Sequence, residues 1–239
     1  MKPVALLQHD KTQRPGYLLA HLEEIGVTTR TFFPEEGDDV PRLARDFSGI
    51  VLLGSNRSVN DGLPWMRDEA RLVRNALHAD VPLLGHCFGA QMMAASLGGR
   101  VCVNACPNIG WQPVRVTPAA TAMFGAQEVV AFHWHYETFT IPPGAQRLLF
   151  GRHCLNKAFA IGRHLAFQCH FEVTQDIVAE WCRASAAELS AATGPAVQSH
   201  DQILSKMKDH LPAVHHAARR VYTHWASSLA RRSVVAQVF

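Results

Sequence analysis

The chain has 239 residues, of which 48% are hydrophobic, and a formal net charge of only +3. A chain of this size can bury one sizeable core, and its basic residues form no stripe of the kind that nucleic-acid-binding proteins carry. The spacing of the six cysteines and the short apolar run at the N-terminus argue against a secreted disulfide scaffold, and the absence of a long apolar stretch argues against a membrane protein. We therefore expect a cytoplasmic protein with reduced thiols, no nucleic-acid partner and no membrane contact.

The first hundred or so residues alternate short apolar runs with helical patterns. Apolar and β-rich runs predict strands over residues 4–8, 27–33, 49–54 and 81–85. Apolar residues at helical spacing predict helices over residues 16–26 and 64–79, and a further helix-like stretch follows Cys87. This alternation predicts an α/β fold with a doubly wound, mostly parallel sheet flanked by helices.

From residue 100 onwards the pattern changes to short strands separated by Gly, Pro and Asn turns. These strands are predicted over residues 110–116, 127–135, 145–150, 156–162 and 164–170. Helical patterns return over residues 174–192 and 200–232. We predict one domain over residues 1–190 and a helical C-terminal extension over residues 191–239. The extension packs on the same domain or at a subunit interface, which leaves a homo-oligomer open.

Cys87 stands in the pattern Gly-x-Cys-x-Gly, after a buried strand and before a helix. A nucleophile elbow requires this context, because a tight turn there presents the side chain at the C-terminal edge of the sheet. The N-terminus of the following helix favours the reactive thiolate, and free N–H groups, starting with that of Phe88, can hold a developing oxyanion. The alternative is an inert buried cysteine, and the flanking Gly85 and Gly89 argue against it.

His170 and Glu172 offer a base for this thiol and a group that orients the base. The two residues are two apart in an extended run, so their side chains point the same way. A carboxylate there can fix the imidazole tautomer and stabilise the imidazolium. The pair is a weak signal in a chain with 14 histidines. Its weight comes from its place at the C-terminal edge of a late strand, the edge that carries Cys87.

Residues 85–91, GHCFGAQ, and residues 168–172, QCHFE, together resemble the class I (triad-type) glutamine amidotransferase family, over roughly residues 1–190. The resemblance implies a flavodoxin-like fold and a catalytic triad of Cys87, His170 and Glu172. It also implies that Gln91 helps to hold the glutamine substrate.

Residues 108–114 and 132–145 are similar to free-standing members related to the amidotransferase domain of GMP synthetase. That similarity suggests that His133 and His135 form a wall on the substrate side. The two imidazoles lie on one face of a predicted strand, as metal ligands can, but no third ligand stands at a suitable spacing. We therefore expect neither a metal nor a cofactor.

Residues 54–61, GSNRSVND, are similar to the oxyanion-strand loop of the family. The similarity places Gly54 at the substrate, and the backbone N–H of Ser55 as an oxyanion donor beside that of Phe88. The family usually has Gly-Gly-Pro here, so Ser55 lacks the conformational freedom of the second glycine and predicts a loop held in one orientation. In the late motif Phe171 replaces the usual proline, but the spacing of the triad is kept.

These observations leave three functions open. The first is a glutamine amidotransferase-type cysteine hydrolase that releases ammonia from glutamine through a glutamyl thioester. The second is a γ-glutamyl hydrolase or peptidase, which would use the same acylation on a larger γ-glutamyl amide. The third is a non-catalytic regulatory homologue. The chain has no Walker-type phosphate loop and no second α/β unit after the triad, so an amidotransferase would need a synthase partner chain to use its ammonia.

Overall fold

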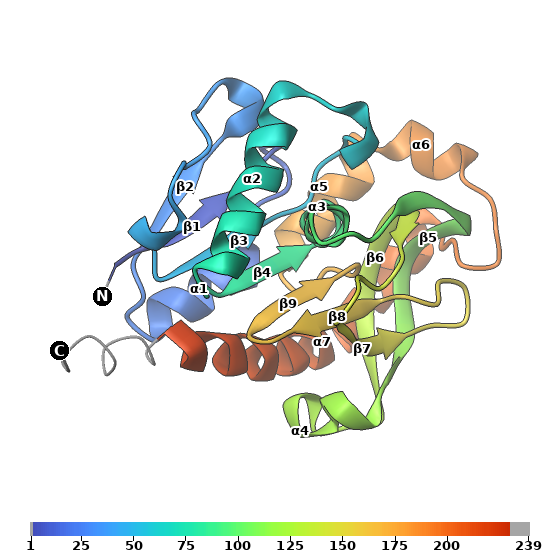
Figure 1. Cartoon of the computed structure of the whole chain (residues 1–239). Helices are drawn as coiled ribbons and strands as arrows, with labels where there is room; N and C mark the ends of the chain where they lie inside the picture. The colour runs from blue at the N-terminus through green and yellow to red at the C-terminus, as the bar shows by residue number, and fades with distance from the viewer. Residues whose placement is uncertain (1, 230–239) are drawn as a thin grey trace, which may run out of the picture.

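A nine-stranded sheet with helices on both faces forms the body of the computed structural model, which describes residues 2–229 (Figure 1). The strands lie in the order β2-β1-β3-β4-β9-β8-β7-β5-β6. Their bounds are β1 Val4–Leu7, β2 Thr29–Phe32, β3 Gly49–Leu52, β4 Leu83–His86, β5 Val101–Val116, β6 Glu128–Phe139, β7 Gln146–Phe150, β8 Ala158–Ile161 and β9 His164–Phe167.

One half of the sheet is parallel and the other half is antiparallel. Strands β2, β1, β3, β4 and β9 run parallel to their neighbours, whereas β9, β8, β7, β5 and β6 are joined by antiparallel pairings. The parallel half, predicted from the alternation of strands and helices, is confirmed. The later strands follow one another through short turns, which cannot make a parallel crossover, and they therefore pair antiparallel.

The helices cover both faces of the parallel half. Their bounds are α1 Gly16–Glu24, α2 Pro64–His78, α3 Phe88–Ser96, α4 Thr121–Phe124, α5 Gln175–Ala184, α6 Ala186–Ala191 and α7 His200–Leu229. Alternate residues of β1 divide between two hydrophobic clusters, with Val4 and Leu6 facing α1, α5 and α7, and Ala5 and Leu7 facing α2 and α3. Figure 1 shows the same two layers of helices. This double burial explains the continuous apolar runs of the parallel strands.

Several elements differ in their bounds from the sequence prediction, and two of the differences have a clear structural basis. The helix predicted over residues 174–192 is divided into α5 and α6 at Ser185. Strand β5 begins at Val101, well before the predicted residue 110, and its register with β6 shifts between Val103 and Asn108. An irregular strand has no regular alternation of polar and apolar residues, so its first part gives no pattern to read.

The C-terminal helix α7 packs on the sheet of its own chain. Tyr222 and Trp225 are fully buried, and the indole N–H of Trp225 donates to the carbonyl oxygen of Leu83 at 3.0 Å. A Cβ at Gly49 would lie 2.5 Å from Leu229, so the helix lies directly against the start of β3. The division into residues 1–190 and 191–239 stays a prediction, and residues 230–239 lie outside the described part of the chain.

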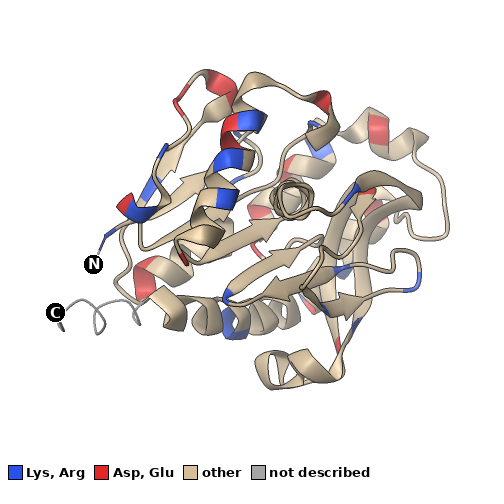
Figure 2. Cartoon of the chain, viewed as in Figure 1, with Lys and Arg blue, Asp and Glu red and all other residues tan. Residues whose placement is uncertain are grey.

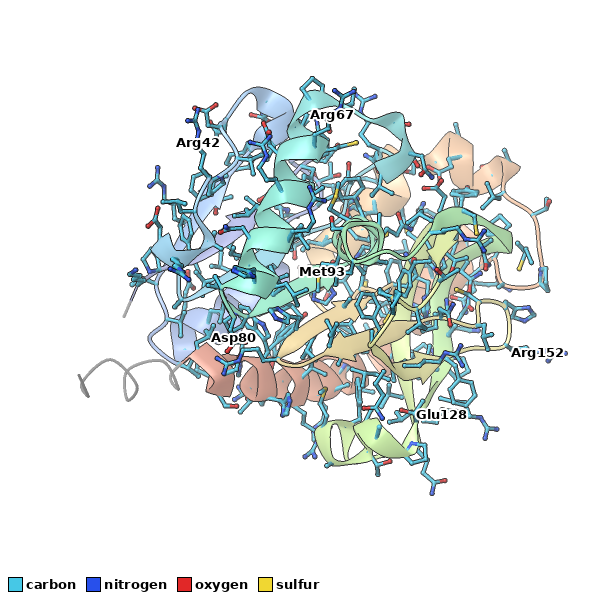
Figure 3. All side chains as sticks on the ribbon, viewed as in Figure 1. Arg42, Arg67, Asp80, Met93, Glu128 and Arg152 are labelled. Atoms are coloured by element: carbon cyan, nitrogen blue, oxygen red, sulfur yellow. The ribbon has the colours of Figure 1, made fainter. Side chains whose placement is uncertain are left out.

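Charged side chains are spread over the outer elements with both signs mixed (Figure 2). In Figure 3 Arg42, Arg67 and Arg152 lie at the periphery, whereas Met93 lies among the central elements and is fully buried. Within residues 2–229, no helix combines the length and the apolar character that crossing a bilayer requires.

Candidate active site

The candidate site lies where four neighbouring parallel strands end. His9 follows β1, Gly54 and Ser55 follow β3, Cys87 follows β4, and His170 follows β9. Because the carboxyl ends of parallel strands meet at one edge of a sheet, residues far apart in the sequence come together there.

Cys87 occupies a strained turn between β4 and α3. Its backbone angles are φ 49° and ψ −107°, in a region that residues other than glycine rarely enter. The flanking glycines are needed for close packing: a Cβ at Gly89 would overlap the carbonyl oxygen of Leu52, and one at Gly85 would lie 2.8 Å from the backbone of Gly89. This is the geometry of a nucleophile elbow, which presents the thiol at the edge of the sheet.

His170 joins the thiol to a carboxylate. Its Nδ1 lies 2.6 Å from Oε1 of Glu172, and the Cys87 sulfur is one of the groups that act on its pKa. Burial alone would lower the pKa of His170, but the Glu172 carboxylate and the Cys87 sulfur outweigh it and raise that pKa to about 10. At neutral pH this position therefore holds an imidazolium beside Cys87.

The backbone and a tryptophan hold the His170 ring in place. The backbone N–H of His170 donates to the carbonyl oxygen of Phe132 at 2.8 Å. The indole of Trp181, from α5, meets the imidazole edge to face with 4.8 Å between ring centroids. The indole N–H of Trp181 donates to the carbonyl oxygen of Thr12, so the indole that packs against the imidazole is itself held in place.

A second buried histidine, His86, lies beside the Glu172 carboxylate. His86 Nδ1 lies 3.3 Å from Glu172 Oε2 and 3.2 Å from the carbonyl oxygen of Cys169, while its Nε2 lies 3.2 Å from the Tyr222 hydroxyl. Burial lowers the pKa of His86, which favours a neutral ring that donates through Nδ1 and accepts from Tyr222 through Nε2. Burial would raise the pKa of Glu172, but the charge of His170 and its hydrogen bond lower it, so Glu172 stays ionised.

A cavity of about 390 Å³ opens over Cys87. It is lined by residues of the loop after β3, the start of α3, the strand β6, and the junction of α5 with α6: Ser55, Asn56, Arg57, Ser58, Cys87, Phe88, Gln91, Trp134, His135, Tyr136, Glu137, Ser185 and Glu188. Among the described residues, neither the Ser55 N–H nor the Phe88 N–H has a hydrogen-bond acceptor. Both donors are thus left free at this cavity, as an oxyanion site requires.

The family assignment rests on a match that covers most of this site. The profile of the family described as glutamine amidotransferase class-I matches residues 16–177, about two thirds of the chain. The chain belongs to the class I glutamine amidotransferase family.

Solved structures and sequence relatives agree with this family. A glutamine amidotransferase of Methylobacillus flagellatus is 34% identical, covers 95% of each chain and superposes with a TM-score of 0.93. A Thermotoga maritima glutamine amidotransferase has a TM-score of 0.84 at 23% identity, over 93% of this chain and 97% of its own, which supports the fold alone. The glutamine amidotransferase-like protein YfeJ of Salmonella typhimurium is 28% identical over 80% of this chain and 84% of its own length.

The amidotransferase also matches part of a larger enzyme. A GMP synthase of Paraburkholderia phymatum is 30% identical over 147 residues, which is 56% of this chain but only 27% of the synthase. The chain therefore spans about a quarter of the length of that relative.

Gln91 and Gln168 form a pair beside Cys87. The Gln91 amide donates to the Glu137 carbonyl at 3.3 Å and to Gln168 Oε1 at 3.2 Å, and Gln168 Nε2 lies 3.7 Å from the Cys87 sulfur. Gln91 thus borders the cavity, as expected for a residue that holds the substrate. The sequence prediction did not include Gln168, although it directly precedes Cys169 and His170 in the late motif.

The two histidines of β6 divide between the cavity and the interior. His135 lines the cavity, whereas His133 is fully buried and does not line it. Both accept from the buried Lys157, whose Nζ lies 3.1 Å from His133 Nδ1 and 3.1 Å from His135 Nε2. The structure therefore does not place His133 at the cavity, because its side chain is fully buried against Lys157. Within residues 2–229, no three His, Cys, Asp or Glu side chains are placed to hold a metal.

Proposed function

We propose that this amidotransferase hydrolyses the side-chain amide of glutamine through a γ-glutamyl thioester on Cys87. The observation that carries the proposal is the arrangement of the triad. Cys87 stands in a strained turn, and His170, whose pKa the Cys87 sulfur helps to raise, lies 2.6 Å from the buried carboxylate of Glu172.

In the first half of the proposed reaction, the Cys87 thiolate attacks the amide carbon of the substrate. The carbonyl oxygen becomes an oxyanion, for which the N–H groups of Ser55 and Phe88 are the free donors. The C–N bond then breaks, and the His170 imidazolium gives its proton to the leaving nitrogen, so that ammonia departs and the γ-glutamyl thioester remains.

In the second half, a water molecule attacks the thioester carbon while neutral His170 takes its proton. The C–S bond breaks, which releases glutamate and returns the Cys87 thiolate and the His170 imidazolium. Glu172 keeps the imidazole oriented through both halves, and its charge stabilises the imidazolium.

The fate of the ammonia belongs to the same proposal. The GMP synthase relative is glutamine-hydrolysing by name, and this chain matches about a quarter of it. We infer that a separate synthase chain accepts the ammonia when glutamine is the physiological substrate. A hydrolase of γ-glutamyl amides would need no such partner, because its products leave into solution.

A substrate panel tests the proposal. Glutamate release is measured from glutamine and from a series of γ-glutamyl amides and dipeptides, with Cys87→Ala as the control for contaminating activity. We expect release from glutamine that depends on Cys87. Fast turnover of a γ-glutamyl amide without any turnover of glutamine would favour the hydrolase instead. No release from any member of the panel would support the non-catalytic homologue.

A further inference from the structure

A buried ion pair lies next to the oxyanion loop, and the proposed reaction does not use it. His9, which follows β1, is 2% exposed, and Glu69 of α2 is fully buried. His9 Nε2 lies 2.6 Å from Glu69 Oε1, and His9 Nδ1 lies 3.1 Å from the carbonyl oxygen of Gly54. An isolated buried charge is costly, so a pair at this place requires a reason.

Both ring nitrogens of His9 face acceptors. A carbonyl oxygen can only accept, so the Nδ1 that faces Gly54 must carry a hydrogen. Burial lowers the pKa of His9, but the charge of Glu69 and the hydrogen bonds to Glu69 and Gly54 outweigh it and raise that pKa. The ring is thus held by Glu69 at Nε2, with its Nδ1 donor fixed on the Gly54 carbonyl.

That carbonyl belongs to the peptide that carries the first oxyanion donor. The Gly54–Ser55 peptide is trans, since residues 2–229 contain no cis peptide bond, and in a trans peptide the C=O and N–H point in opposite directions. A carbonyl turned towards His9 therefore turns the Ser55 N–H away from it. Ser55 lines the Cys87 cavity, and a Cβ at Gly54 would lie 3.3 Å from Cε1 of His170.

His9 also contacts the residue that carries the second donor. Its ring packs against Phe88 with 4.8 Å between centroids and stacks on Trp65 at 5.1 Å. One side chain therefore touches both segments of the oxyanion site, the loop after β3 and the start of α3. In the flipped peptide the Ser55 N–H would face the His9 N–H, and two donors facing each other repel.

We propose that the buried His9–Glu69 pair is a positioning pair, which holds the Gly54–Ser55 peptide with its N–H turned to the carbonyl group attacked by Cys87. The assignment rests on the proposed function, because it concerns an oxyanion formed at Cys87. The pair also explains the single loop orientation that the sequence predicts from Ser55. Ser55 has no left-handed φ, and the Gly54 carbonyl oxygen is held by His9 Nδ1.

The test compares two reactions of the same thiol in the full chain. Acylation by 4-nitrophenyl acetate passes through an oxyanion, whereas alkylation by iodoacetamide is a displacement that forms none. The test variant is His9→Phe combined with Glu69→Met, which keeps an aromatic ring on Trp65 and Phe88 and leaves no buried charge alone. Rates measured with Cys87→Ala are subtracted, so that only reaction at Cys87 counts.

We expect the double variant to lose at least about tenfold in acylation, towards the roughly 10²–10³-fold that a missing oxyanion donor costs, while alkylation changes by less than about threefold. Glu69→Gln should keep most of the acylation rate, because its amide can donate to His9 Nε2 while His9 still donates to Gly54. The matched control is His164→Phe, another buried histidine, at the opposite end of β9; it should leave the ratio of the two rates unchanged.

Three results would overturn the assignment. The first is an unchanged acylation rate in the double variant. The second is an equal loss of acylation and alkylation, which would give the pair a merely structural role. The third is a loss in Glu69→Gln as large as in the double variant.

Glutamate release from glutamine is followed in parallel with the wild-type chain. Its absence would contradict the proposed function, whereas the ratio of acylation to alkylation would still decide the role of His9.

Discussion

Solvent exposure and local activation predict different cysteines as the first to react with an alkylating agent. Cys102 is exposed, whereas Cys87 is only 7% exposed, so solvent access alone would make Cys102 react first. The His170 imidazolium and the N-terminus of α3 lie beside Cys87, whereas Cys102 is exposed and has no such neighbours in the proposed site. We expect limited iodoacetamide treatment at neutral pH, followed by peptide mapping, to find Cys87 modified first. Earlier modification of Cys102 or Cys154 would contradict an activated elbow.

The members of the triad should not be equally important for turnover. Cys87→Ala removes the bond-forming atom, and His170→Ala removes both the imidazolium and the proton donor, so both should abolish measurable hydrolysis. Glu172→Gln keeps a hydrogen-bond acceptor but loses the charge, and we expect a partial loss, within the about 10²–10⁴-fold of a general acid-base group.

The pH profile of Glu172→Gln gives a second readout. The carboxylate stabilises the His170 imidazolium and so raises the pKa of His170 to about 10. The wild-type rate should therefore fall as the pH rises through about 10, where the proton donor is lost. Without the carboxylate that pKa falls, so the alkaline limb should move to lower pH. An alkaline limb at the same pH in both proteins would refute the role given to Glu172.

The residues of the proposed triad could be singled out in the sequence because each lies in a short motif next to a recognisable strand. His9, His86 and Glu69 could not, because their partners come from other segments: Gly54 and Glu69 for His9, and Tyr222 for His86. A single histidine among 14 carries no sign of which contact it will make. Only the strand order brings these side chains to one edge.

At the scale of elements, the parallel strands were predictable and the first part of β5 was not. Helices on both faces require the central parallel strands β1 and β3 to be apolar along their whole length, and such runs are visible in the sequence. Strand β5 has a register shift and contains Pro107, which cannot donate to a ladder, so its start resembles a loop. The local sequence does not record the pairing that makes it a strand.

Helix α7 reaches the active site through one hydroxyl group. Tyr222 donates to His86 Nε2 at 3.2 Å, and His86 in turn lies against Glu172. Tyr222→Phe removes one buried hydrogen bond and frees the His86 tautomer. We expect a loss of about 1 kcal/mol in the free energy of unfolding and a decrease in kcat of up to about tenfold.

Tyr17→Phe is the matched control for Tyr222→Phe. Tyr17 lies on α1 and also contacts α7, stacking on His215 with 4.1 Å between ring centroids. The Tyr17 hydroxyl makes no hydrogen bond to His86, so removing this hydroxyl should leave kcat unchanged. Equal kcat values for the two variants would show that the hydroxyl of Tyr222 does not act on the triad.

At the scale of the whole molecule, α7 completes the core rather than extending it. Tyr222, Trp225 and Val221 are fully buried, and the Trp111 indole N–H donates to the carbonyl oxygen of Ile203 at 2.9 Å. A chain ending at residue 190 would lack α7 and would expose the part of the core that α7 covers. We expect it to lose cooperative thermal unfolding, whereas a chain ending at residue 229 should keep it. Cooperative unfolding of the shorter chain would show that residues 1–190 form an independent domain.

The measurement that tests the account most directly is the mass of the whole chain during turnover. The enzyme is mixed with glutamine, quenched with acid within the first turnover and weighed by mass spectrometry. We predict a species heavier by one γ-glutamyl group, with one ammonia released for each adduct, and no such species in Cys87→Ala. Release of glutamate without any adduct, or an adduct that persists in Cys87→Ala, would contradict covalent catalysis by Cys87.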